Sequence, residues 1–130
     1  MTFIKTNIDE TNKKQVYRMT KGDSAKIEGI EKGVSLPVEL YALYDEVKTR
    51  KKQDGSEEEY TQRVLTFTSG GHKFGTISAT FIRSFLEIVE IMDGEPFAVI
   101  ITGGQSKNGR NYVNCELDCD FDIKVLAPNA

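Results

Sequence analysis

Apolar and polar residues alternate along much of the chain, and this period of two is typical of half-buried β-strands. The two longest alternating runs, 36–52 and 57–68, flank Asp54-Gly55, and Asp-Gly between such runs is a strong hairpin signal. Further short strands are expected at 16–19, 25–28, 72–76, 97–102, 112–117 and 121–126. The pattern therefore predicts a mainly β protein.

Opposite charges favour one register for the long hairpin. A two-residue turn at Asp54-Gly55 gives the pairs Lys52–Glu57, Lys51–Glu58, Arg50–Glu59 and Glu46–Arg63. Each such pair contributes roughly 0.2–1 kcal/mol, so we expect this register. It gives a core face with Leu40, Ala42, Tyr44, Leu65 and Phe67. The opposite face, which either another segment or a ligand would cover, carries Tyr41, Leu43, Val47, Tyr60, Val64 and Thr66.

The second hairpin, between 97–102 and 112–117, is expected to turn at Asn108-Gly109. Lys107 and Arg110 would then stand opposite each other at its tip. The residues expected on its inner face are Ala98, Ile100, Val113, Cys115 and Leu117. Those expected on the outer face are Phe97, Val99, Ile101 and Tyr112.

One segment has the period of a helix instead. Its apolar residues recur at spacings of three and four, at Phe81, Phe85, Ile88, Val89 and Met92. Ser78 is a good N-cap, and Asp93-Gly94 is a stop signal. The sequence therefore predicts one α-helix over about 78–92.

This helix falls between the third and fourth main strands, which is the plan of an OB-fold, a five-stranded antiparallel barrel. A plain α+β sandwich would give a similar pattern and remains the alternative. Residues 1–14 are polar and aperiodic, so we expect a flexible N-terminal arm. Residues 15–126 would form a single OB-like domain, and 127–130 a short tail.

Charge limits the choice of partners. The 130 residues hold 17 Lys and Arg against 20 Asp and Glu, a net charge of -3, so binding to nucleic acid would need a locally basic surface. The first residues lack the apolar core of a signal peptide, and no run approaches the roughly 20 apolar residues of a membrane span. We therefore expect a cytoplasmic protein that contacts no membrane.

Catalytic and metal-binding motifs are incomplete. His72 is the single histidine, and with Cys115 and Cys119 it gives too few zinc ligands at irregular spacing, so the cysteines are interpreted as buried, reduced thiols. The glycine-rich segment 70–76 lacks the lysine of a phosphate-binding loop, and the acidic segment 118–122 lacks the glycine of a calcium loop. We expect neither an enzyme nor a bound cofactor or metal.

Basic and aromatic residues occur together on the predicted hairpins and connections. Single-stranded nucleic acid is bound by such a combination, because cations follow the phosphates and flat rings stack on bases. The candidate phosphate contacts are Lys48, Arg50, Lys51, Arg63, Lys73, Lys107 and Arg110. The candidate stacking rings are Tyr41, Tyr60, Phe74 and Tyr112.

Three segments, 72–85, 96–101 and the Ser-Lys-Asn-Gly-Arg-Asn-Tyr run at 106–112, resemble the small single-stranded DNA-binding proteins of phages and plasmids of Gram-positive bacteria, especially lactococcal phages. The resemblance covers roughly 16–118. It implies an OB-fold, a homodimer or higher homo-oligomer, and a role in phage or plasmid DNA replication or recombination, in the host cytoplasm and alongside other replication or recombination proteins.

The resemblance also implies that Lys107, Arg110 and Tyr112 clasp the DNA strand together with the long hairpin, 36–68. One departure is the end of the chain, 124–130, which is not the acidic tail by which bacterial proteins of this kind recruit partners. The alternative function is a phage protein-interaction or assembly module that binds no nucleic acid. The acidic net charge and an apolar outer face with Phe97, Val99 and Ile101 would favour that alternative.

Overall fold

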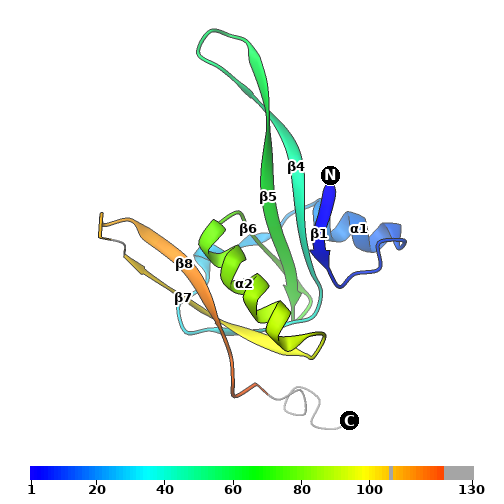
Figure 1. Cartoon of the computed structure of the whole chain (residues 1–130), viewed down its shortest axis with the longest axis vertical. Helices are drawn as coiled ribbons and strands as arrows, with labels where there is room; N and C mark the ends of the chain where they lie inside the picture. Colours follow the sequence, from blue (N-terminus) through cyan, green and yellow to red (C-terminus); the bar gives the residue numbers. More distant parts are fainter. Residues whose placement is uncertain (106, 122–130) are drawn as a thin grey trace.

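The computed structural model describes residues 1–105 and 107–121, which form two β-sheets, two α-helices and a short 3-10 helix (Figure 1). The first sheet has the order β1-β4-β5-β6-β2 and is antiparallel except for the β2–β6 pair. Its strands are β1 Thr2–Thr6, β2 Ala25–Lys26, β4 Tyr41–Lys51, β5 Glu57–Ser69 and β6 His72–Thr76.

The second sheet is antiparallel, with the order β3-β7-β8. Its strands are β3 Ser35–Val38, β7 Phe97–Gln105 and β8 Asn111–Leu117. Because β3 runs almost directly into β4, one stretch of chain belongs to both sheets. The mainly β prediction is confirmed, but within the described residues the two sheets do not close into a barrel.

Helix α2, Ala79–Met92, covers the inner face of the first sheet and confirms the helix predicted from the sequence (Figure 1). The Ser78 side chain accepts a hydrogen bond from the Phe81 N–H, and Asp93 ends the helix in a left-handed conformation at φ 45°. Phe85 of α2 packs against Phe67 of β5, with ring centroids 5.6 Å apart, and the fully buried phenylalanines anchor the core. Burying a side chain of this size contributes roughly 1.5–3 kcal/mol.

The N-terminal region folds onto the other face of the same sheet. Part of the expected flexible arm is strand β1, which pairs with β4. The prediction of a strand at 16–19 is wrong, because Lys13–Thr20 forms helix α1. The Asn12 side chain caps this helix by accepting a hydrogen bond from the Gln15 N–H. The strand expected at 25–28 is only Ala25–Lys26 and continues into a 3-10 helix, Ile27–Gly29. A second buried cluster lies beneath α1 and comprises Ile8, Met19, Ala42 and Tyr44.

The register predicted for the long hairpin is wrong by one residue. Lys51 pairs with Glu57, and Asp45 rather than Glu46 pairs with Arg63. The cause is a three-residue loop, in which the Gly55 N–H donates to the Lys52 carbonyl at 3.1 Å and Gly55 adopts φ +87°.

A shift of one residue exchanges the two faces of a strand. Tyr41 and Leu43 therefore join Leu65 and Phe67 in the core, whereas Ala42, Tyr44 and Val64 belong to the cluster beneath α1. The predicted face assignment is thus corrected for β4.

The faces of β7 are also exchanged relative to the prediction. The β7–β8 connection has five residues, 106–110, because Gln105 pairs with Asn111. Phe97, Val99 and Ile101 are consequently buried against α2 and the core, with Val113 and Cys115 of β8. The apolar outer face that favoured a protein-interaction module is therefore absent from β7.

Both cysteines are free, but only Cys115 is buried, so the expectation of a buried thiol at Cys119 is wrong. Burial raises the pKa of the Cys115 thiol to about 12. Of the strand expected at 121–126 and the tail at 127–130, only Phe121 lies within the described residues. Neither α-helix in the described part of the chain is long and apolar enough to cross a membrane.

Candidate nucleic-acid interface

The outer half of the β4–β5 hairpin extends beyond the other strands of both sheets (Figure 1). Lys48 and Tyr60 are direct cross-strand partners there, and the Arg50 guanidinium lies 4.9 Å from the centroid of the Tyr60 ring. One face of the hairpin therefore carries three of the predicted site residues, Lys48, Arg50 and Tyr60. We call this face the hairpin strip. The strip combines two cations with a half-buried ring.

Acidic side chains accompany the cations of the hairpin strip. Lys48 pairs with Glu46 at 3.3 Å, and Arg50 pairs with Glu58. The Lys48 and Arg50 side chains are 45% and 63% exposed, so these ion pairs contribute about 0–1 kcal/mol and a phosphate could compete for either cation. The strip offers cations, but it is not a region of excess positive charge.

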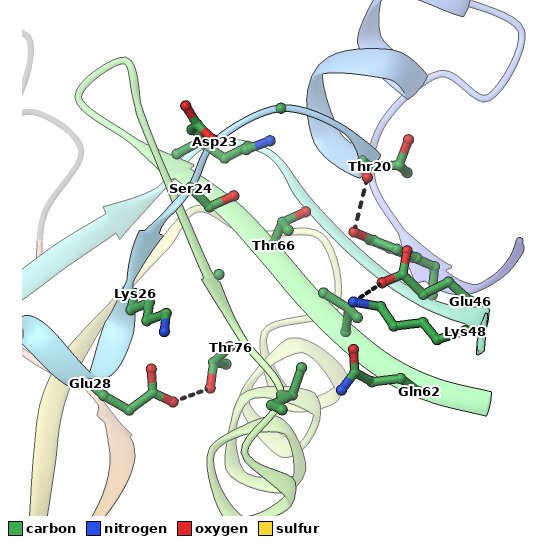
Figure 2. A pocket seen from close by; sticks show the side chains of 16 residues that line it. Thr20, Asp23, Ser24, Lys26, Glu28, Glu46, Lys48, Gln62, Thr66 and Thr76 are labelled. Atoms are coloured by element: carbon green, nitrogen blue, oxygen red, sulfur yellow. Dashed lines mark hydrogen bonds and ion pairs between the residues drawn. The ribbon is translucent and has the colours of Figure 1, made fainter. Parts of the chain in front are cut away.

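A hollow of about 680 Å³ lies at the base of the strip, between the outer face of the sheet and the segment after α1 (Figure 2). Lys48 and Glu46 meet at one side of it, and Glu28 accepts a hydrogen bond from Thr76 at 2.8 Å at another. Tyr44 lines the hollow, and burial together with the charge of Glu46 raises its pKa to about 12. The lining mixes lysines with carboxylates, so the hollow suits a polar ligand without attracting anions strongly.

Two of the predicted stacking rings lie inside the protein. Tyr41 and Phe74 are each 8% exposed, and Tyr41 meets the Phe85 ring edge-on at 5.7 Å. Phe74 packs against Phe67, with centroids 5.6 Å apart. Tyr41 faces inward because of the one-residue register shift, and neither ring can stack on a base from this position. These two residues are therefore removed from the predicted site.

Lys73 is also placed differently from the prediction. Its ammonium donates hydrogen bonds to the carbonyls of Arg18 and Lys21, at 2.8 and 2.6 Å, where helix α1 ends. Removal from water lowers the pKa of Lys73, and the nearby Arg18 lowers it further while Asp23 opposes the shift. The observed role of Lys73 is to hold α1 against β6.

Lys51 and Arg63 lie on the face of the hairpin opposite the strip. Arg63 binds both carboxylate oxygens of Asp45, at 3.0 and 3.3 Å. This hydrogen bonding raises the pKa of Arg63 and lowers that of Asp45. The structure therefore does not bring these two cations together with Lys48 and Arg50.

The end of the β7–β8 hairpin presents the remaining predicted residues, Lys107, Arg110 and Tyr112, which we call the tip surface. Lys107 and Arg110 are exposed, and Tyr112 is 45% exposed. The Tyr112 ring lies over Gly104: a Cβ at that glycine would be 3.6 Å from two of its ring carbons. Residues 103–112 contain no acidic side chain.

The neighbouring Gly103 is required for the backbone of the tip surface. A Cβ there would lie 2.3 Å from the Tyr112 carbonyl oxygen, far inside any real contact. Close approach of β7 and β8 at this point therefore positions Tyr112. Among the described residues, neither Lys107 nor Arg110 takes part in an ion pair.

One exposed ring that borders a cavity together with cations is not among the predicted site residues. Tyr17 of α1 is 67% exposed and borders a cavity of about 570 Å³ with Arg18, Lys21 and His72. The sequence predicts a strand at 16–19, and a strand does not bring these residues together. The Asn12 N-cap followed by apolar residues at positions 16 and 19 is the signal that could have revealed it.

Comparisons of the chain with protein-family models, with curated proteins and with solved structures find no match.

Proposed function

We propose that this protein is a non-enzymatic, sequence-tolerant single-stranded DNA-binding protein whose primary contact is the tip surface. The observation that carries the proposal is that one exposed tyrosine ring and two exposed cations occur within six residues of one hairpin end, in a segment without acidic residues. Lys107 and Arg110 would neutralise phosphates, and Tyr112 would stack on a base. The hairpin strip, with Lys48, Arg50 and Tyr60, would provide a second contact.

Energetics support the choice of the tip surface over the strip. Stacking of a base on an aromatic ring contributes roughly 1–3 kcal/mol, and it tolerates any sequence because every base has a flat face. Cations at the tip surface bind a phosphate without first releasing a carboxylate, whereas Lys48 and Arg50 must release Glu46 and Glu58. Because the chain as a whole has a net charge of -3, a phosphate should prefer the surface whose cations are not paired with carboxylates.

The connectivity supports the same function. Helix α2 lies between β6 and β7, and the β3–β4 stretch belongs to both sheets. The order from β4 to β8 is similar to that of an OB-fold, although the two sheets do not close into a barrel, and OB-folds bind oligonucleotides with loops that would correspond to the β4–β5 and β7–β8 hairpins. A role in phage or plasmid DNA replication or recombination, as a cytoplasmic homo-oligomer, completes the proposal and depends on the sequence resemblance.

The proposal is tested by fluorescence anisotropy with labelled oligo-dT over a series of salt concentrations. Removing two phosphate contacts with Lys107→Ala/Arg110→Ala should reduce the slope of log affinity against log salt by about 1.4, at about 0.7 per phosphate. Lys13→Ala/Lys14→Ala removes the same charge from the exposed start of α1, on the other side of the molecule (Figure 1), and should leave the slope unchanged.

Stacking is tested separately at Tyr112. Tyr112→Ala should weaken binding about 5- to 150-fold, which corresponds to a loss of roughly 1–3 kcal/mol, whereas Tyr112→Phe should bind like the wild type. An unchanged salt slope in the double variant would exclude the tip surface as the contact. If the wild-type protein binds neither oligo-dT nor duplex at low salt, or prefers duplex, the proposed function is wrong.

A further inference from the structure

Strand β5 has one edge that is open along the outer half of the hairpin. Residues 57–64 pair with β4 on one side, but β6 pairs with β5 only from Leu65 onward. No other strand in the described part of the chain pairs with this edge (Figure 1). An open edge presents unpaired N–H and C=O groups, and an extended peptide can bind to them as an additional strand.

The hydrogen-bond pattern identifies the backbone groups that such a peptide would meet. The Lys52 N–H donates to the Ser56 carbonyl at 2.7 Å, so Ser56 directs its backbone polar groups toward β4. This direction alternates along an antiparallel strand, so every second residue from Glu57 onward directs its N–H and C=O away from β4. Leu65 follows the same alternation and pairs with Thr76 of β6. The residues that direct these groups to the open edge are Glu57, Glu59, Thr61 and Arg63.

A cavity of about 590 Å³ lies beside this edge, between β5 and the first turns of α2. Thr61 lines it from β5 and faces the α2 side of the sheet, because side chains alternate along a strand and Leu65 is in the core. Ile77, 58% exposed, borders the cavity. The other apolar side chains that line it are Ala79, Ile82 and Leu86. A residue paired opposite Thr61 would therefore place its side chain over an apolar surface.

Unpaired charges of opposite sign lie at the two ends of this groove. Glu57 and Glu59 are exposed toward the hairpin tip, and Arg83 of α2 is exposed and lines the cavity. None of these three side chains forms an ion pair with another described residue. Arg63, in contrast, is already bound by Asp45. Arg83 is therefore the cation of the groove that is available to a ligand.

These charges determine which occupant fits. A nucleic acid would bring its phosphates close to Glu57 and Glu59, which repel them. A second copy of the chain would place the glutamates of its own edge over the cavity and would leave Ile77 without an apolar cover. A peptide that is acidic at one end and basic at the other meets an unpaired opposite charge at both ends of the groove.

We propose that the groove between β5 and α2 binds an extended segment of a partner protein as an additional antiparallel strand. The segment carries a carboxylate at its N-terminal end, beside Arg83, then an apolar side chain opposite Thr61, and basic side chains opposite Glu59 and Glu57. Antiparallel pairing repeats the arrangement of β4 and β6 on β5. Backbone hydrogen bonds supply affinity in this mode of binding, and alternate side chains supply specificity.

A synthetic peptide with this pattern, acetyl-Glu-Thr-Ile-Thr-Lys-Thr-Lys-amide, tests the proposal. In the proposed register its isoleucine lies opposite Thr61, and its lysines lie opposite Glu59 and Glu57. Titration followed by the amide signals of the protein in nuclear magnetic resonance spectra should show saturable shifts at 57–63 and in the first turns of α2. The complex should dissociate in the micromolar range, because the contact is short.

Two methylated peptides provide a matched control for the backbone pairing. The isoleucine N–H donates to the Thr61 carbonyl in this register, so a methyl group on that nitrogen should weaken binding about 10-fold. The N–H of the following threonine points away from β5, and methylation there should leave the affinity nearly unchanged.

Variants of the protein test the side-chain contacts. Glu57→Lys/Glu59→Lys should weaken binding roughly 5- to 20-fold, and exchanging both peptide lysines for glutamate should restore it. Ile77→Ala should weaken binding roughly 3- to 10-fold through lost apolar burial. Ile91→Ala is the control, because Ile91 is 75% exposed on α2 but does not line the cavity, and this variant should bind like the wild type.

Several results would overturn the proposal. No amide shifts at millimolar peptide, or equal affinity of the two methylated peptides, would show that β5 does not pair with it. Shifts at 57–63 that depend on protein concentration alone would assign the edge to a second copy. Shifts of the same amides by oligo-dT would assign it to nucleic acid. The peptide titration contains no DNA, so its outcome is independent of whether the tip surface binds oligo-dT.

Discussion

The sequence predicts that Lys73 binds phosphate, whereas the structure gives it a structural role at the end of α1. Replacing Lys73 by methionine tests which of these two roles is correct. Methionine retains the apolar stem but removes the ammonium that donates to the Arg18 and Lys21 carbonyls. Arg18 belongs to the last turn of α1 and Lys21 is its C-cap, and at this end of a helix intrahelical donors are absent and a cation is favoured. We therefore expect Lys73→Met to loosen α1 from the sheet.

The magnitude follows from the contacts. A hydrogen bond to a charged group contributes about 1.5–3 kcal/mol when it is well shielded, and a cation at a helix C-terminus about 0.3–1 kcal/mol at the surface. Lys73 is only half-buried, so water replaces part of what the ammonium supplies. We expect a loss of about 1–2 kcal/mol, which for a chain of this size lowers the melting temperature by roughly 3–8 °C.

Thermal unfolding followed by circular dichroism measures the loss, and hydrogen exchange of the α1 amides shows whether it is local. Lys26→Met is the control, because Lys26 is exposed and lines the same hollow as Lys73. Affinity for oligo-dT should be nearly unchanged in both variants. A Lys73→Met protein that melts like the wild type but binds DNA much more weakly would show that the ammonium faces nucleic acid, and the structural assignment would be wrong.

Two further predictions concern β7–β8 and the thiols. Gly103→Ala should separate the strands beside Tyr112, because the new Cβ would lie 2.3 Å from a carbonyl oxygen, and should weaken both thermal stability and oligo-dT binding; an unchanged melting temperature would contradict this. At pH 8 a thiol reagent should modify Cys119 alone, since the Cys115 pKa of about 12 and its burial keep that thiol protonated and covered. Two rapidly reacting thiols per folded chain, counted by mass spectrometry, would exclude this.

The accuracy of the sequence predictions depended on whether a feature is encoded locally. Helix α2 was predicted correctly because its apolar period, its Ser78 cap and its Asp93-Gly94 stop are all contained in the segment. Helix α1 was missed because it has only two turns and is stabilised from outside, by burial of Met19 and by the ammonium of Lys73. The local signal, the Asn12 cap with apolar residues at 16 and 19, is too short to separate a helix from a strand without those contacts.

The predicted register of the long hairpin is wrong for a different reason. Ion pairs do not distinguish neighbouring registers when several basic residues face several acidic ones. In the observed register Glu58 still forms ion pairs with both Arg50 and Lys52, so the shift by one residue loses little electrostatic energy. The discriminating feature is the left-handed Gly55 in a three-residue loop, and Asp54-Gly55 is compatible with either loop length.

Register then determined which predicted site residues are exposed. A shift of the register by one residue moves an aromatic ring on β4 from the outer face to the core. Tyr41 is therefore a core residue, whereas Tyr60 of β5 lies on the outer face as predicted. Residues in the connection at the end of a hairpin are exposed in either register. Lys107 and Arg110 are therefore exposed as predicted, although the observed register does not pair them opposite each other. A binding site predicted from sequence alone is consequently most secure at hairpin ends, and in this protein that is the end of the β7–β8 hairpin, with Lys107 and Arg110.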